Sequence, residues 1–120
     1  MEGIVVLFEV KPTKEGLMRY LELAKMLKSS IASCDGFVSS ERFSSLSEDG
    51  KLLSMSIWRD IKAVEKWRNC IDHRMCQKEG REKLFESYQI TVCSSIRSYS
   101  LKNREEAPSD SNSFFMENEK

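Results

Sequence analysis

The only histidine of the chain, His73, is the residue best suited to acid–base chemistry. Its imidazole titrates near pH 6.5, so at neutral pH it could accept the proton of a phenol or hydrogen-bond a carbonyl group. Asp72 precedes it and is typical of a helix N-cap, where many histidines are exposed surface residues. We therefore expect His73 to be either a catalytic base or a surface residue.

Cys70, His73 and Cys76 form a Cys-x2-His-x2-Cys run, which is a weak zinc motif. A structural zinc site takes four ligands, and no fourth ligand lies near this run in the sequence. A helix break at Asp72 would also separate the three side chains. None of the four cysteines forms a Cys-x-x-Cys pair, so we predict no metal site and expect free thiols in a reducing compartment.

Composition narrows the class of protein. A chain of 120 residues allows one domain, and 40% hydrophobic residues are enough for a core. Zero formal net charge, without a basic run carrying aromatic residues, argues against nucleic-acid and anionic-membrane binding. The longest apolar run, residues 4–8, is far shorter than the roughly 20 residues that span a bilayer. With no basic segment before it, the sequence predicts a cytoplasmic protein.

Apolar residues recur with the periods of strands and helices along most of the chain. Thr13, Asp60 and Asp72 are expected helix N-caps, and Gly36 and Gly50 are expected turn residues with positive φ. The predicted strands cover residues 4–10, 37–46, 51–58 and 88–99, and the predicted helices cover 14–33, a segment from 60, and 72–88.

The alternation within two strands predicts which side chains share a face. Leu53, Met55 and Ile57 are expected on one face of their strand, with Trp58 on the other, packed under a helix. Phe37, Ser39, Glu41 and Phe43 are expected to share one side of the preceding strand. Phe8, Phe37 and Phe43 cannot all face the helices.

The predicted order β-α-β-β-α(α)-β is the split βαβ pattern of ferredoxin-like α+β domains. Four antiparallel strands would carry helices on one face, and a second copy of the sheet would cover the other face in a homodimer. We expect this domain to occupy residues 1–101. Residues 102–120 are polar and lack periodicity, so they read as a disordered tail, within which Phe114, Phe115 and Met116 are either incidental or an anchor that docks on a partner subunit or blocks a pocket.

An ordered set of segments, rather than one motif, resembles the antibiotic biosynthesis monooxygenase family. The similarity extends over roughly residues 3 to 100 and leaves out the tail. The segments are Phe8 to Pro12, Gly36-Phe37-Val38-Ser39-Ser40-Glu41-Arg42-Phe43, Gly50-Lys51-Leu52-Leu53-Ser54, Trp58, Ala63-Val64-Glu65-Lys66-Trp67-Arg68, His73-Arg74 and Tyr88-Gln-Ile.

This resemblance implies a dimeric α+β barrel with a pocket between the sheet and the helices of each subunit. It also implies oxygenation of a phenol, a quinol or a similar small aromatic molecule by dioxygen, with no cofactor. His73 would be the catalytic residue that assists deprotonation, and Trp67, Phe8 and Phe43 would bind substrate. Trp67 is equally well explained as a core aromatic packed on the sheet. No Gly-x-Gly-x-x-Gly motif is present, which argues against a Rossmann-type dinucleotide site.

Two other functions remain open at this point. The same fold could serve as a dimeric binding module without catalysis. A heme-binding or heme-degrading protein is the other alternative, because a related branch of the family degrades heme. That branch carries an axial histidine ten residues after the tryptophan, where this chain has Gln77, and a first-strand asparagine where it has Leu7 or Phe8. Arg42 and Arg97 are expected rim charges unless one of them enters the pocket and holds a substrate anion.

Overall fold

The computed structural model describes residues 3–70, 74 and 77–118. His73 and Asp72, together with Met75 and Cys76, lie outside the described residues, so the predictions that concern them stay predictions. The elements in chain order are β1 (Ile4–Pro12), α1 (Leu17–Ala32), β2 (Phe37–Ser44), β3 (Leu52–Trp58), α2 (Ile61–Arg68), the π-helix η1 (Gly80–Leu84), β4 (Phe85–Ser94) and α4 (Ser109–Asn118).

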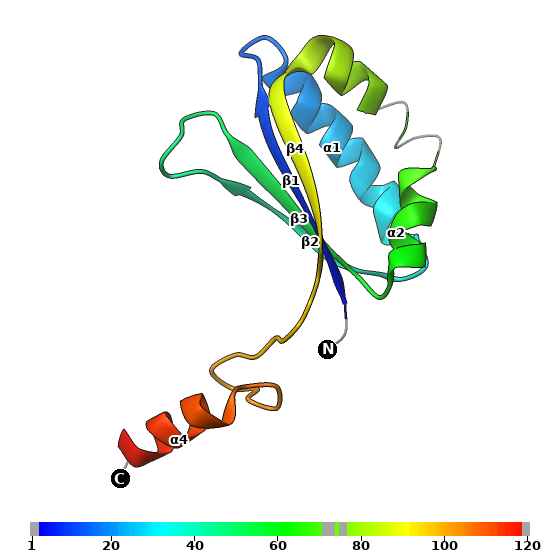
Figure 1. Cartoon of the computed structure of the whole chain (residues 1–120). Helices are drawn as coiled ribbons and strands as arrows, with labels where there is room; N and C mark the ends of the chain where they lie inside the picture. Colours follow the sequence, from blue (N-terminus) through cyan, green and yellow to red (C-terminus); the bar gives the residue numbers. More distant parts are fainter. Residues whose placement is uncertain (1–2, 71–73, 75–76, 119–120) are drawn as a thin grey trace.

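One sheet organises the domain. Its strands lie in the order β2-β3-β1-β4, and every neighbouring pair is antiparallel. Helices α1 and α2 cover one face of the sheet and leave the other face without helices (Figure 1). The predicted ferredoxin-like α+β fold is therefore confirmed. Within the described part of the chain, no helix combines the length and the apolar character that crossing a membrane requires.

The strand register assigns each side chain to the helix-facing side or to the helix-free face. Directly opposed residues of antiparallel strands lie on the same face. Trp58 lies opposite Ile4, and Ile57 opposite Val5. The helix-free face carries an apolar band along the two central strands, with Cys93 and Phe43 beside it on the edge strands. The band consists of Val5, Leu7, Leu53, Met55 and Ile57.

A register shift between Phe37 and Ser39 corrects one prediction about β2. Phe37 lies opposite Trp58, on the helix-facing side, whereas Phe43 lies opposite Leu53, on the helix-free face. The expectation that Phe37, Ser39, Glu41 and Phe43 share one side was therefore wrong for Phe37. A bulge places one extra residue in a strand, so the alternation of faces inverts across it.

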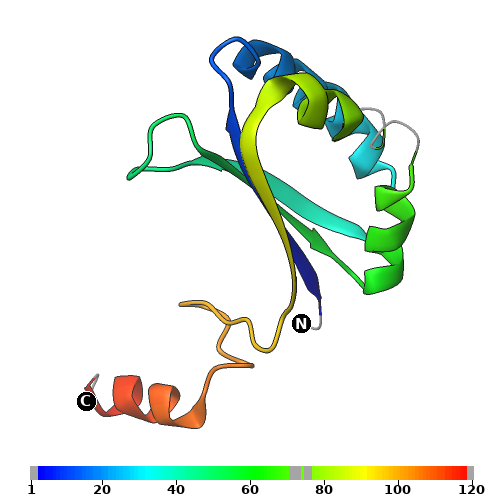
Figure 2. The same cartoon turned by 45° about the horizontal axis from the view of Figure 1, so that its top comes forward.

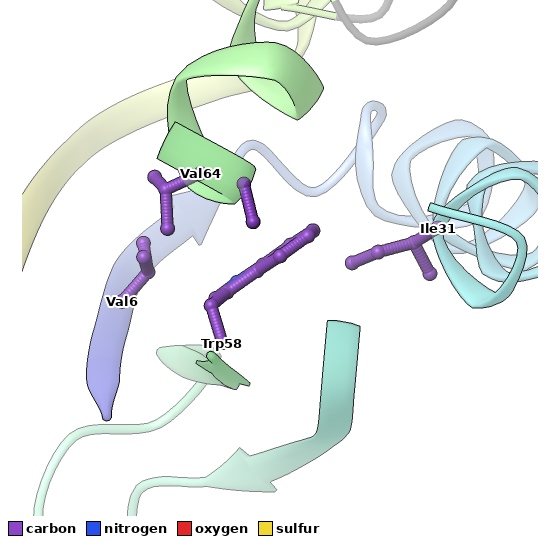
Figure 3. Packing of buried hydrophobic residues seen from close by; sticks show 5 residues of the cluster. Val6, Ile31, Trp58 and Val64 are labelled. Atoms are coloured by element: carbon purple, nitrogen blue, oxygen red, sulfur yellow. The ribbon is translucent and has the colours of Figure 1, made fainter. Parts of the chain in front are cut away.

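The core lies where β3 meets α2 and the end of α1. Trp58 is completely buried there and packs among Val6 of β1, Ile31 of α1 and Val64 of α2 (Figure 3). Its indole Nε1–H donates a hydrogen bond of 2.9 Å to the hydroxyl of Ser56, which is also buried. The predicted packing of Trp58 under a helix is confirmed.

Helix α2 begins at its predicted N-cap, whereas helix α1 begins later than predicted. Asp60 is the N-cap of α2, because its carboxylate accepts a 2.9 Å hydrogen bond from the Ala63 N–H. Helix α1 begins at Leu17 with Gly16 as N-cap, not at Lys14 with Thr13. The Thr13 hydroxyl instead accepts from the Gly16 N–H at 2.9 Å, and the Thr13 N–H donates to the Leu84 carbonyl at 2.8 Å. Thr13 thus holds the turn before α1 against η1.

The predicted third helix extended too far, and the last strand starts earlier than expected. Helical residues 77–79 lead into η1, which ends at Leu84, and β4 then runs over Phe85–Ser94. Ladder pairing with β1 reaches back to Phe85, opposite Pro12, and ends at Ser94, opposite Ile4. Arg97, which we expected on this strand, lies beyond it.

The segment after β4 contains regular structure, although its sequence shows no periodicity. Helix α4 forms over Ser109–Asn118 and lies away from the sheet and from α1 and α2 (Figure 2). Phe114 belongs to α4 and is exposed, whereas the side chains of Phe115 and Met116 are outside the described part.

Candidate functional site

Trp67 marks one end of the helix-facing side. It follows Ala63 and Val64 by four and three residues on α2, and both of these are buried, so Trp67 lies on the same helix face. Its ring stacks on Trp58, with 5.2 Å between ring centroids and 32° between ring planes. Trp67 is only half-buried, so it both packs on the core and presents part of its surface outward.

Charged residues at the β2 and β3 ends hold α2 in position. Arg59 donates to Asp35 at 3.0 Å and to Asp60 at 2.9 Å, and its backbone N–H donates to the Gly36 carbonyl at 2.7 Å. The Arg59 guanidinium lowers the pKa of both carboxyls by hydrogen bonding to them. The turn before β2 is therefore tied to the residue that caps α2, which fixes the place of Trp67.

A cluster of four aromatic rings marks the other end. The Tyr20 and Phe85 centroids are 5.5 Å apart, the Phe8 and Phe85 centroids 5.8 Å, and the Phe8 and Tyr88 centroids 5.9 Å. The rings come from α1, β1 and β4. Tyr20 is buried, whereas Tyr88 is 42% exposed, so the cluster opens toward β4.

From this cluster onward, the helix-facing side of β4 is apolar and about half exposed. Tyr88, Ile90 and Val92 are 42%, 45% and 50% exposed, and we call these three residues the open row. Ile90 lies opposite Phe8, and Val92 opposite the buried Val6. Tyr88 lies opposite Val10, so the open row runs along the interval from Val6 to Val10, about 13 Å of strand.

The open row is the candidate binding site because it joins exposed apolar side chains to a cluster of aromatic rings. Exposed aliphatic and aromatic side chains that lie side by side on one strand favour a small apolar ligand. The rings of Phe8 and Tyr88 could stack on a planar ligand. Trp67 and Phe8, two of the three predicted substrate-binding residues, are thus brought to the same side of the sheet.

Phe43, the third predicted binding residue, lies on the opposite face. It is 40% exposed and borders a shallow groove of about 250 Å³ at the β2–β3 hairpin, lined also by Glu9, Lys51 and Leu53. The structure therefore does not bring Phe43 together with Trp67 and Phe8. A second hollow of about 650 Å³ lies beside α2, and the pairs of Arg59 with Asp35 and Asp60 make up part of its polar lining.

The structure gives a direction to Arg42, whose orientation the sequence left open. Arg42 lies opposite Ser54 on the helix-facing side, with its guanidinium carbon 5.6 Å from the Tyr20 ring centroid. This cation–π contact places it on the β2 side of Tyr20, and the open row lies on the β4 side. Arg42 is thus part of the scaffold around Tyr20 rather than of the open row.

Sequence reasoning missed Tyr20, Phe85 and the open row as site residues. The alternation of Ile90 and Val92 with polar neighbours was visible, but alternation does not show that the helices stop short of β4. Nothing in the helical period of residues 14–33 singled out Tyr20. The register of β1 with β4 is what joins these residues into one surface.

The described residues contain no cluster that suits a metal ion. No group of three His, Cys, Asp or Glu residues is gathered there. Cys34, Cys70 and Cys93 are free thiols, and burial together with the nearby Cys70 raises the pKa of Cys34. Cys34 is therefore a poor nucleophile at neutral pH.

Comparison with known proteins identifies a family and two relatives. The family model described as antibiotic biosynthesis monooxygenase matches residues 3–79. A jasmonate monooxygenase ABM of Pyricularia oryzae is 39% identical over 103 residues, which are 83% of this chain and 48% of that protein. The uncharacterized protein YqjZ of Bacillus subtilis is 32% identical over 73 residues, or 61% of this chain and 62% of that protein. The chain thus spans about half the length of the first relative.

A solved structure supports the same fold. SnoaB, a cofactor-independent oxygenase from Streptomyces nogalater, superimposes with a TM-score of 0.70 at 10% sequence identity. The match covers 82% of this chain and 97% of that protein. At this level of identity the likeness concerns the fold alone.

Proposed function

Because this chain belongs to the antibiotic biosynthesis monooxygenase family, we propose that it is a monooxygenase whose open row binds a small apolar substrate. The observation that carries the proposal is the uncovered apolar surface of Tyr88, Ile90 and Val92 on the helix-facing side of β4. A surface that only stabilised the domain would be covered by its own helices. The row is about 13 Å long, with Phe8 opposite its middle residue Ile90, and this length matches a small ring system.

The first substrate class is a phenol or quinol that reacts as its anion. Removal of a proton leaves an electron-rich carbanion or phenolate that can transfer electrons to dioxygen without a cofactor. Oxidation of a quinol to a hydroxyquinone then balances: a ring C–H becomes C–OH with one oxygen atom, and the two hydroxyl hydrogens of the quinol leave with the other oxygen atom as water. The substrate supplies all four electrons. His73, outside the described residues, would take the first proton.

The second substrate class follows from the relative named a jasmonate monooxygenase. A jasmonate is a small molecule with a ketone ring and an alkenyl side chain, and its largely apolar body matches the apolar open row. We therefore propose jasmonic acid as a probe beside 1,4-naphthoquinol. Oxygenation at a ketone would need a reductant in the assay, whereas the quinol would not, so the two probes separate the two chemistries.

The helix-free face supports a homodimer. Its apolar band of Val5, Leu7, Leu53, Met55 and Ile57 has no cover among the described elements. A second copy that packs the same face against it would bury the band in a two-fold interface. We also propose that the protein functions in the cytoplasm. The free thiols at Cys34, Cys70 and Cys93 support this location, because a reducing compartment keeps thiols unpaired.

Oxygen uptake with product analysis tests the activity. Wild-type protein should consume oxygen with 1,4-naphthoquinol or with jasmonic acid plus a reductant, and Trp67→Phe, His73→Ala and Phe8→Leu should slow the reaction at least several-fold. Phe43→Leu is the matched control, because it makes the same change on the opposite face and should leave the rate near that of wild type.

Two results would contradict the proposal. Binding of both probes without any oxygen uptake would favour a binding module. Equal rates for Phe8→Leu and Phe43→Leu, or wild-type rates in Trp67→Phe and His73→Ala, would show that the site assignment is wrong.

A further inference from the structure

The residues after β4 form an arm that reaches away from the domain. We call residues 95–118 the C-terminal arm. The Ser95 N–H still donates to the Gly3 carbonyl at 2.9 Å, and from there the arm leaves the sheet (Figure 1). The molecule extends 57 Å along its longest axis and 20 Å along its shortest, and both views show α4 far from α1 and α2 (Figure 2).

The arm is ordered by its own contacts. Arg104 lies over the Tyr99 ring at 5.0 Å and donates to the side chains of Asn112 and Ser111, both at 3.0 Å. The Ser100 N–H donates to the Asn103 carbonyl at 2.8 Å, which closes the turn before Arg104. A fully solvated tail would not be expected to form this cluster of contacts around Arg104. These contacts give the arm a defined shape between Tyr99 and α4.

That shape presents two aliphatic side chains to solvent. Ile96 is 93% exposed and Leu101 is 91% exposed, whereas the aliphatic residues of the open row are about half exposed. A second copy that covered both side chains would remove this apolar surface from water, which favours association.

The size of the helix-free face suggests what the arm would contact. With strands about 4.8 Å apart and about 3.3 Å per residue, a four-stranded face of this length has a flat area of roughly 450 Å². A stable interface takes about 800 Å² of accessible surface from each partner. Protruding side chains make the accessible area larger than the flat area. The face is nevertheless small for the interface of a stable homodimer. An arm that reaches onto the partner would add the missing area.

The helix-free face also offers a place for the arm. The groove beside Phe43, Lys51 and Leu53 lies at the hairpin end of that face, and the arm starts at the other end, where Ser94 pairs with Ile4. A two-fold axis perpendicular to the strands reverses their direction. With this symmetry, the start of one arm lies over the hairpin end of the second copy. The two-fold axis then generates the same contact a second time.

We propose that the C-terminal arm of one copy packs on a second copy of this chain, with Leu101 against the groove beside Phe43. The inference rests on the homodimer proposed above and extends it. The arm lies outside the segment that the family model matches. Phe43, which takes no part in the open row, has its role in this contact.

The dissociation constant of the full-length dimer tests the arm. Analytical ultracentrifugation over a range of concentrations should show that Leu101→Asp and Phe43→Asp each raise this constant at least tenfold, with an unchanged circular dichroism spectrum. Met18→Asp is the matched control, because Met18 is a 73% exposed apolar residue of α1 and should leave the constant unchanged. A photo-crosslinking amino acid at position 101, in a mixture of isotopically light and heavy chains, should join light to heavy peptides that contain Phe43 or Leu53.

Each outcome decides between the two proposals. If wild type is a dimer and Leu101→Asp dissociates no more than Met18→Asp, the arm contact is wrong and the dimer stands. Crosslinks confined to single chains, or made to other proteins, also overturn the arm contact. If wild type is a monomer at every concentration, the dimer and the arm contact are both wrong. Oxygen uptake, measured separately, decides the monooxygenase proposal.

Discussion

A Cβ atom on Gly36 would lie 2.5 Å from the Cβ of Ala63. Gly36 is the turn residue before β2, with φ at 86°, and Ala63 is a buried residue of α2. The close approach lets α2 pack on Trp58 and places Trp67 against the Trp58 ring. The position therefore requires glycine for two reasons, its backbone conformation and its missing side chain.

Gly36→Ala should lower the free energy of unfolding by more than the cost of the backbone alone. The left-handed conformation costs a non-glycine residue roughly 1–2 kcal/mol, and the clash with Ala63 adds to this. Gly50→Ala is the control, because Gly50 has φ at 80° with nothing within 4 Å of a new Cβ. Urea unfolding should give a lower free energy of unfolding for Gly36→Ala than for Gly50→Ala. Equal stabilities would show that α2 moves freely to make room.

Ser56→Ala should destabilise the domain although it removes a single oxygen atom. The buried indole N–H of Trp58 would lose its acceptor, and an unsatisfied buried donor costs about 1–3 kcal/mol. Ser40→Ala is the control on the same face of the sheet, because Ser40 is exposed. Thermal unfolding should separate the two variants, and an unchanged midpoint for Ser56→Ala would contradict the assigned hydrogen bond.

Low pH should weaken the ion pairs that Arg59 forms with Asp35 and Asp60. Hydrogen bonds from Arg59 lower the folded-state pKa of Asp35 and of Asp60 below their ordinary value of 3.8. Their stabilisation is therefore present above about pH 4 and is lost as the pH falls through the lowered values. Thermal midpoints measured between pH 6 and pH 2.5 should fall less steeply for Asp35→Asn than for wild type. Parallel curves would contradict the assignment.

The open row should behave as a binding surface and not as core. Ile90→Ala removes a 45% exposed side chain, so the free energy of unfolding should change by less than about 1 kcal/mol, while the dissociation constant of a bound probe rises several-fold. Val10→Ala is the contrasting variant, because Val10 is 1% exposed in the core and its truncation should lower stability. A strongly destabilised Ile90→Ala with unchanged probe affinity would assign Ile90 to the core.

The sequence predicted the faces of β3 correctly because the alternation of Leu53, Met55 and Ile57 with small serines leaves one solution. It failed at β2, where the bulge after Phe37 inverts the faces without a residue that marks it. It also failed at Phe85, because an apolar residue after a helical run fits the helix as well as the strand, and only the pairing with Pro12 decides between them.

The site was predictable only in part for a related reason. Trp67 and Phe8 lie on segments whose pattern is clear, and they do share the helix-facing side. Phe43 was placed with them because apolar character alone does not tell one face of a sheet from the other. The open row could not be predicted, since it depends on how far the helices extend over β4, which is a property of packing and not of periodicity.

The most direct test of the site is an NMR titration of 15N- and methyl-labelled protein with 1,4-naphthoquinol, kept reduced and anaerobic, and with jasmonic acid. We predict that, whichever probe binds, the largest chemical-shift changes occur at Ile90, Val92, Phe8 and the Trp67 indole. Shift changes concentrated on Leu53, Met55 and Ile57, with the open row unaffected, would contradict it.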